Sequence, residues 1–281
     1  MTDADIEYLS FPRISAGRAR GGREAQQDAL VCLNDSNEGT SLLVVADGMG
    51  GDGAGELAAE GVIAVARRLW NEDLWRSQPA PMFLEILCQE AHEELIRRRQ
   101  ALMYGEPHST IVALLLRGDR ASWVHVGDSR LYCFMGSRCT ERTLDHSLAQ
   151  LKVTRGQIRP EQIPKDPDQH KLLRGLGGDV PPEVEHGGSM LHPGQTFVLC
   201  SDGIWEHLTT RELGQMASRD DHQQAMRELL AVALERGGDD SDNAAVVLAR
   251  TSDAGRFRRL GAQMWSTISD TVAGRRGDAV A

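Results

Sequence analysis

The chain has 281 residues, enough for one large domain or two small ones. Its 41% hydrophobic and 26% charged residues are ordinary for a globular protein with a buried core. The formal net charge of −10 leaves no surplus of Lys and Arg to neutralise phosphates, which argues against a nucleic-acid or anionic-membrane partner. A site for several cations and a solvated acidic surface would each produce this excess of acids.

The predicted elements, taken in chain order, group into strands, then helices, then more strands. Short runs rich in Val, Leu and Ile, bounded by Gly, Asp or Asn, predict strands at 29–33, 41–46, 110–117, 121–126, 130–134, 195–200 and 243–249. Helical periodicity and i,i+4 acid–base pairs predict helices at 54–69, 81–102, 210–217 and 223–235. This grouping favours an α+β fold with an antiparallel sheet over a Rossmann sheet.

The segment 147–188 is rich in Gly, Pro and charge and has weak periodicity. A long irregular segment inside a compact domain is more often functional than filler. We therefore predict that it is a flap beside the active site. A variable surface excursion is the alternative.

The cysteines and the N-terminus bear on the compartment. The five cysteines are scattered, and no two of them form a C-x-x-C pair, which suits a reducing environment. The N-terminus lacks a signal-peptide pattern, and no apolar run reaches the roughly 18 residues that span a bilayer. We expect a cytoplasmic protein with no membrane partner.

Five aspartates stand at the boundaries of predicted strands. Asp47 follows the run LLVVA, Asp202 follows FVLCS, and Asp242 directly precedes NAAVVLA. Asp128 ends WVHVG, and Asp28 opens ALVCL. Each alone could be a turn residue. Because carboxylates fixed at strand ends are preferred ligands of hard cations, the five together predict a Mg²⁺ or Mn²⁺ site.

Other hydrolytic chemistries lack their motifs. No cysteine is followed six residues later by Arg, and neither G-x-S-x-G nor H-E-x-x-H occurs. Asp47 is followed two residues later by Met49, so the D-x-D of haloacid-dehalogenase-like phosphatases is absent. The nine histidines never pair at a metal-ligand spacing, so we expect them to be structural or exposed. Water is the favoured nucleophile.

Seven motifs follow one another in register: R-E-A-Q-Q-D (23–28), V-A-D-G-M-G-G (45–51), S-T-I-V-A-L-L (109–115), V-G-D-S-R-L-Y (126–132), D-H-S (145–147), L-C-S-D-G-I-W-E (199–206) and D-N-A-A-V-V (242–247). Together they resemble the bacterial metal-dependent protein phosphatases of the type 2C, or PPM, family. The resemblance implies a four-layer α-β-β-α sandwich of two antiparallel sheets flanked by helix pairs. It also implies hydrolysis of phosphoserine and phosphothreonine in proteins by a metal-activated water.

The same resemblance implies the ligands of a binuclear Mn²⁺ or Mg²⁺ centre. Asp47 would bridge the two ions, and the Gly48 carbonyl would complete the second site. Asp202 and Asp242 would hold the first ion. Asp128 matches the ligand of a third, weaker metal in bacterial members.

Two further roles and two departures follow from the resemblance. Asp28 would orient metal-bound water, and Arg23 would bind the phosphate oxygens as a planar donor fork. Gln27 stands where relatives often have Glu or Gln, and a neutral amide implies a second metal site that is weaker or relies on water ligands. Met49 stands where some relatives carry His as a candidate general acid, although bacterial relatives commonly have Met. The resemblance then implies that leaving-group protonation comes from metal-bound water or from a residue not identified in the sequence.

The predicted partners are phosphorylated proteins and a cognate bacterial Ser/Thr kinase. Two alternatives remain open: a pseudophosphatase that serves as a scaffold or metal-binding regulatory module of the same fold, and a phosphatase restricted to one regulator. The predicted organisation is an N-terminal segment (1–13), a catalytic domain (14–250) and a C-terminal tail (251–281). Apolar residues at helical steps predict that the tail is an amphipathic helix outside the catalytic machinery.

Overall fold

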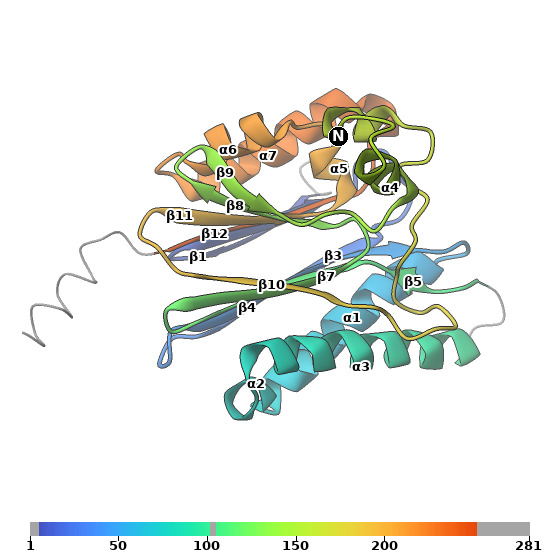
Figure 1. The fold of residues 1–281 in the computed structure, drawn as a ribbon. Helices are drawn as coiled ribbons and strands as arrows, with labels where there is room; N and C mark the ends of the chain where they lie inside the picture. The colour runs from blue at the N-terminus through green and yellow to red at the C-terminus, as the bar shows by residue number, and fades with distance from the viewer. Residues whose placement is uncertain (1–5, 102–104, 252–281) are drawn as a thin grey trace, which may run out of the picture.

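Two antiparallel sheets face each other in the computed structural model, which describes residues 6–101 and 105–251 (Figure 1). The strands are β1 (Ile6–Phe11), β2 (Ile14–Ala19), β3 (Asp28–Asp35), β4 (Thr40–Met49), β5 (His108–Ser109), β6 (Ile111–Arg117), β7 (Arg120–Val126), β8 (Arg130–Met135), β9 (Arg138–Arg142), β10 (Glu185–Met190), β11 (Gln195–Cys200) and β12 (Ala244–Arg250). One sheet has the order β1-β2-β12-β11-β8-β9. The other has the order β10-β7-β6-β4-β3, with β5 paired to β4.

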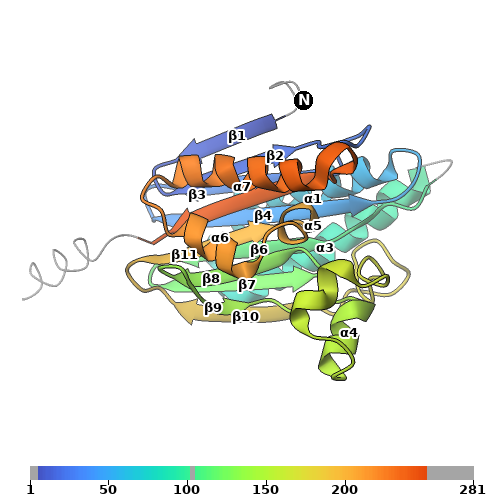
Figure 2. The same ribbon diagram turned by 90° about the horizontal axis from the view of Figure 1, so that it is seen from above.

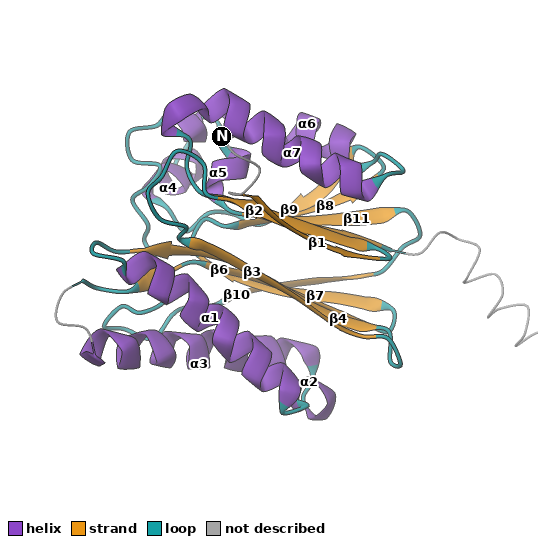
Figure 3. Ribbon diagram, turned by 180° about the vertical axis from the view of Figure 1, so that it is seen from behind, coloured by secondary structure: helices purple, strands orange, loops and turns teal. Residues whose placement is uncertain are grey.

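The helices cover the two outer faces of this pair of sheets (Figure 3). They are α1 (Ala54–Asn71), α2 (Leu74–Ser77), α3 (Ala80–Ala101), α4 (Leu148–Thr154), α5 (Asp202–Trp205), α6 (Thr210–Ala217) and α7 (His222–Gly237), with short 3-10 helices η2 (Pro160–Lys165) and η3 (Gly238–Asp240). Helices α1 and α3 pack on the β4-containing sheet, and α6 and α7 pack on the other sheet (Figures 1 and 3). The expected four-layer α-β-β-α fold is confirmed.

Three apolar layers hold the sandwich together. The middle layer lies between the sheets and contains Leu43, Val45 and Phe197, each fully buried. A second layer joins α1 and α3 to one sheet, and a third joins α5, α6 and α7 to the other. Because β4 is buried on both faces, its run of Leu and Val is continuous rather than alternating.

Five strands were not predicted from the sequence: β1, β2, the two-residue β5, β9 and β10. Strand β2 reads ISAGRA, with small residues because α7 packs closely on it. A Cβ on Gly17 would lie 2.7 Å from the Leu230 side chain. Strand β10 reads EHGGSM and lies at a sheet edge with mostly exposed or half-exposed residues. Neither sequence shows the apolar alternation by which strands are recognised.

The segment 147–188 is more ordered than its composition indicates. It contains α4, whose N-terminus is capped where Ser147 Oγ accepts from Gln150 N at 3.2 Å, as well as η2 and the start of β10. Figure 2 shows α4 at one end of the sandwich, beyond the strands. Within the described residues, no helix is long and apolar enough to cross a membrane. The predicted amphipathic helix of the tail lies outside the described residues, which end at Thr251.

Candidate metal centre and phosphate site

The predicted aspartates come together at one end of the two sheets. Asp47 lies near the end of β4, directly opposite Asp28 on β3. Asp202 begins α5 immediately after β11, and Asp242 lies just before β12. Asp128 lies in the turn between β7 and β8. Strands far apart in sequence therefore deliver five carboxylates to one place.

Four of these carboxylates line one pocket of about 240 Å³. Its lining residues are Arg23, Gln27, Asp47, Gly48, Met49, Gly50, Asp128, His170, Leu172, Asp202, Asp242 and Asn243. Asp28 is 2% exposed and does not line the pocket, so it acts on the pocket from behind.

The backbone around Asp47 is fixed by its neighbours. Asp47 N donates to Thr110 Oγ1 at 3.1 Å, and Thr110 N donates back to Asp47 O at 2.8 Å. Ser109 Oγ also donates to the Asp47 carbonyl, at 3.0 Å. These bonds use the main chain and leave the carboxylate available to a ligand.

Gly48 occupies a position that excludes any side chain. A Cβ there would lie 1.9 Å from the carbonyl oxygen of Gly55, and Gly48 N donates to Gln27 O at 2.9 Å. The backbone of β4 thus approaches both α1 and the 20–27 loop closely. This close approach explains why glycine directly follows Asp47.

The electrostatics of the pocket are dominated by crowded negative charge. Burial, followed by the neighbouring carboxylates, raises the pKa of Asp47 well above its usual range. Burial and Asp202 also raise the pKa of Asp128 and of Asp242. For Asp28, burial raises the pKa, and the hydrogen bond from Ser201 opposes that rise. Each carboxylate is costly to ionise without a compensating positive charge.

This donor set fits hard divalent cations. The pocket presents carboxylate oxygens and backbone carbonyls, and no cysteine lines it. Mg²⁺ and Mn²⁺ prefer oxygen ligands of this kind. Divalent cations would also neutralise the charge that raises the pKa values of Asp47 and Asp128. The residues present therefore fit the metals that the sequence resemblance implies.

Asn243 organises the loop that carries Arg23. Its Oδ1 accepts from Gln27 N at 2.7 Å, and its Nδ2 donates to the carbonyls of Arg20 and Ala25 at 2.7 and 3.0 Å. Arg23 lies at the pocket rim with its side chain 55% exposed, and its Nη2 lies 2.7 Å from Asp242 Oδ2. The sequence placed Asn243 in a motif but gave it no role.

Ser201 plays a similar supporting role behind the pocket. Its Oγ donates to Asp28 Oδ2 at 2.5 Å and accepts from Ala245 N at 2.9 Å. One hydroxyl therefore links β12 to Asp28. Sequence reasoning did not single out Ser201, although it directly precedes Asp202.

His170 is one of the histidines expected to be structural or exposed, and the structure places it beside the carboxylate pocket. It is exposed, but it lies on the segment 147–188, with Nδ1 at 3.7 Å from both Asp202 Oδ2 and Glu206 Oε1. Contact with Asp202 raises the pKa of His170 to about 9, and burial raises the pKa of Glu206 to about 7. Spacing along the chain could not reveal this neighbour, because the loop that carries it has no periodic pattern.

A pocket of oxygen ligands at one end of an α-β-β-α sandwich is the arrangement expected of metal-dependent protein phosphatases. Residues 18–245 match the sequence model described as protein phosphatase 2C. The chain belongs to this family and is a metal-dependent serine/threonine protein phosphatase.

The curated relatives include enzymes from several bacteria. A putative protein phosphatase 2C-type of Streptococcus pyogenes is 28% identical over 86% of this chain and 99% of its own length. The serine/threonine protein phosphatase PstP of Mycobacterium tuberculosis is 30% identical over 76% of this chain, and the match spans 41% of that longer protein.

Solved structures agree with the sequence relatives. The M. tuberculosis phosphatase PstP/Ppp superimposes with a TM-score of 0.73 at 26% identity, covering 88% of this chain and 99% of that chain. A structure of the PstP catalytic domain in complex with two manganese ions has a TM-score of 0.71 at 27% identity, with the same coverage of both chains. The family, fold and enzyme class expected from the sequence are thereby confirmed.

Proposed function

We propose that this chain hydrolyses phosphoserine and phosphothreonine in proteins at two Mn²⁺ or Mg²⁺ ions held by its own aspartates. Asp47 and the Gly48 carbonyl, with Asp202 and Asp242, are the proposed ligands, and Asp128 is the proposed ligand of a weaker third ion. The observation that carries this proposal is the pocket of about 240 Å³ lined by four carboxylates that repel one another. The two manganese ions in the related PstP catalytic domain support it.

The proposed mechanism assigns separate tasks to the protein's side chains. Two bound cations would lower the pKa of a water molecule and neutralise charge that grows on the phosphoryl oxygens. Ser201 fixes one oxygen of Asp28, which leaves the other free to orient a water molecule. Arg23, at the rim, would bind the phosphate oxygens through its planar guanidinium.

Release of inorganic phosphate tests this proposal. We expect turnover of phosphothreonine peptides and of p-nitrophenyl phosphate with Mn²⁺ or Mg²⁺ and none in excess EDTA. Calorimetry with Mn²⁺ should show two or more binding events. A chain that binds Mn²⁺ but releases no phosphate would instead support the metal-binding regulatory module.

The Arg23→Ala variant tests the phosphate-binding role. We expect kcat/KM for phosphopeptides to fall by about 10- to 100-fold, because a charge-assisted, bidentate contact to phosphate is lost. Mn²⁺ affinity should not fall, because Arg23 is a cation that competes for Asp242. Steady-state kinetics and Mn²⁺ titration measure the two effects separately.

Arg23→Lys is the matched control, since it keeps the charge and removes the donor fork. It should recover part of the lost kcat/KM. Because Arg23 is 55% exposed, neither variant should unfold the protein. Unchanged kinetics in Arg23→Ala would show that Arg23 is a surface residue with no part in binding phosphate.

We also propose that a bacterial Ser/Thr kinase supplies the phosphoproteins and that the two enzymes meet in the cytoplasm. The family's action on phosphorylated proteins supports this pairing. Co-expression of a candidate kinase with the chain or its Asp202→Asn variant tests it. Phosphothreonine should accumulate on shared substrates only with the variant.

A further inference from the structure

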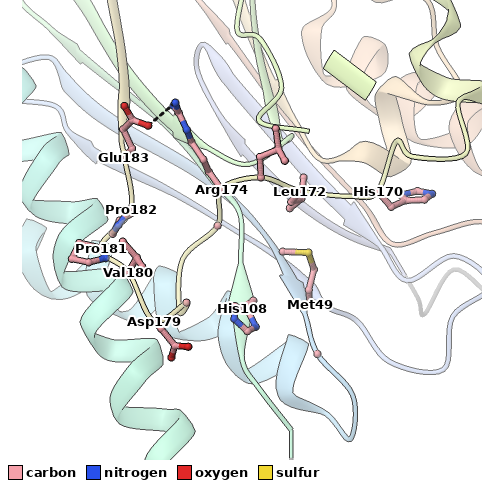
Figure 4. A pocket seen from close by; sticks show the side chains of 14 residues that line it. Met49, His108, His170, Leu172, Arg174, Asp179, Val180, Pro181, Pro182 and Glu183 are labelled. Carbon is pink, nitrogen blue, oxygen red and sulfur yellow. Dashed lines mark ion pairs between the residues drawn. The ribbon is translucent and has the colours of Figure 1, made fainter. Parts of the chain in front are cut away.

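A second, larger pocket lies beside the carboxylate pocket and shares lining residues with it. This substrate groove, as we call it, has a volume of about 640 Å³ and is drawn in Figure 4. Met49, Gly50, His170 and Leu172 line both pockets. A chain that places a phosphorylated residue among the aspartates therefore has the groove directly beside it.

The groove has two walls from distant parts of the chain. Met49 and His108, from the paired strands β4 and β5, lie on one side, and residues 179–183 lie on the other (Figure 4). His170 lies at the end away from Val180 (Figure 4). One wall thus comes from the strand that carries Asp47 and from its partner β5. The other comes from the segment 147–188, which also carries His170.

The groove is formed before any ligand binds. Leu176 N donates to Ser109 O at 2.8 Å, and Ser109 N donates to Leu176 O at 3.2 Å. These two bonds attach the segment 147–188 to β5. Gly177 N donates to His92 Nδ1 at 3.1 Å. Beyond that anchor, Pro181 and Pro182 restrict the backbone of the far wall. Little ordering is needed when a peptide enters.

Apolar side chains dominate the part of the groove away from His170, and the charged side chains there are paired with each other or with a neighbour. Met49, Leu172, Leu173, Val180, Pro181 and Pro182 contribute apolar side chains. Arg174 Nη2 lies 2.6 Å from Glu183 Oε2, and Asp179 Oδ1 lies 2.9 Å from Arg99 Nη1. His170, at the other end, already contacts Asp202 and Glu206, so an acidic or basic residue in the apolar part of the groove would lose water without gaining an unpaired counter-charge.

We infer that this groove binds an apolar side chain of the phosphoprotein substrate, one to three residues from the phosphorylated Ser or Thr, and so selects among substrates. The inference rests on the proposed function, because the phosphorylated residue must lie among the aspartates. The volume of the groove lies within the range of about 300–1,000 Å³ that ligand pockets usually have. Val180 is 75% exposed and Leu173 is 57% exposed, so both are available to a passing chain.

Phosphothreonine peptides that differ at one flanking position test the inference. Each position from three before to three after the phosphothreonine carries Leu in one peptide and Asp in the other. At the position that enters the groove, we expect kcat/KM to be about 10-fold or more higher for Leu than for Asp, as for other apolar pockets. Values within about twofold of each other at all six positions would overturn the inference.

Opposite charges at position 180 locate the preference on the protein. Val180→Lys should raise kcat/KM for the Asp peptide about 5-fold or more above its value in Val180→Asp, because the first attracts the flanking carboxylate and the second repels it. Met82 is the matched control, since it is 55% exposed on α3 and does not line the groove. Met82→Lys and Met82→Asp should have equal kcat/KM for the Asp peptide.

Equal kcat/KM values for Val180→Lys and Val180→Asp would overturn the inference even if the wild-type protein prefers Leu. Each peptide rate is divided by the Mn²⁺-dependent rate of the same variant on p-nitrophenyl phosphate, which has no flanking residues. A wild-type chain that cleaves p-nitrophenyl phosphate but shows no flanking preference contradicts the groove alone. A chain that cleaves neither substrate with Mn²⁺ contradicts the proposed function and the groove together.

Discussion

Replacing Asp202 by asparagine is expected to lower kcat by at least about 100-fold at saturating Mn²⁺ while the protein stays folded. Asp202 lies close to the other three carboxylates of the pocket and to Asp28 outside its lining, since its charge raises the pKa of Asp28, Asp47, Asp128 and Asp242. An amide has the same shape but no charge, so it binds a divalent cation more weakly. Phosphate release measures the loss of kcat, and Mn²⁺ titration measures the loss of metal affinity.

The stability of the same variant should not fall. Asp202 is surrounded by carboxylates, and its cationic neighbour His170 is exposed and also lies 3.7 Å from Glu206. Its replacement therefore removes more repulsion than attraction. We expect the melting temperature in EDTA to equal or exceed that of the wild type. The increase in melting temperature that Mn²⁺ produces should shrink, because a ligand stabilises a fold in proportion to its binding. Unfolding of the variant in EDTA would contradict this account.

Asp52→Asn is the matched control for this experiment. This substitution makes the same change from carboxylate to amide, but on an exposed turn. Asp52 has φ 55°, a backbone conformation that Asn adopts readily. It does not line the carboxylate pocket, and its substitution should leave kcat within about twofold of wild type. Near wild-type turnover by Asp202→Asn, or turnover by the wild type in excess EDTA, would refute the metal-dependent mechanism.

The sequence predicted the helices and central strands well because their apolar patterns are strong. Helix α6 runs over the predicted residues 210–217, and α1 and α3 lie within one or two residues of the predicted ends. The missed strands are those whose stability comes from neighbours. Strand β1 is mostly exposed and depends on backbone pairing with β2, which no local pattern records.

The candidate site was predictable where chemistry and strand boundaries coincide. Asp47, Asp128, Asp202 and Asp242 each stand at an element boundary, and the structure places all four on one pocket. Their individual metal roles remain predictions. Asp28 was predicted with them, but the structure places it behind the pocket on a hydrogen bond from Ser201.

Residues that act through loops could not be found in this way. His170 reaches Asp202 because the segment 147–188 brings His170 and Leu172 to the pocket, a path set by contacts such as the bond from Leu148 N to Lys171 O at 2.9 Å. Asn243 acts through three bonds to a loop more than 200 residues earlier in the chain. Partners that distant leave no trace in local spacing.

A buried ion pair beside the pocket joins the D-H-S motif to β8. Arg130 Nε and Nη2 donate to the two oxygens of Asp145 at 2.7 and 2.5 Å, with side-chain exposures of 5% and 0%. The Arg130 guanidinium also lies 3.5 Å from the centre of the Trp205 ring. Trp205 Nε1 in turn donates to Asp128 O at 3.0 Å. The pair therefore supports the backbone of a predicted metal ligand.

Asp145→Ala is expected to lower the free energy of unfolding by about 3–5 kcal/mol, because it leaves the Arg130 charge buried without its carboxylate partner. Removing both members should cost less, since no unpaired charge then remains. The double variant Arg130→Met with Asp145→Leu is accordingly expected to be more stable than Asp145→Ala. Urea denaturation at pH 7 in EDTA, with midpoint and slope fitted for each variant, measures these differences.

Glu7→Ala provides the matched control, because it breaks an ion pair at the surface. Glu7 accepts from Arg18 Nε and Nη2 at 3.0 Å each, but its own side chain is 69% exposed, so water replaces the lost contact. We expect a change of about 0–1 kcal/mol there. If Asp145→Ala shifts stability no more than Glu7→Ala, burial does not make the inner pair costly to break. The Trp205–Asp128 contact would then have to be supported by apolar packing alone.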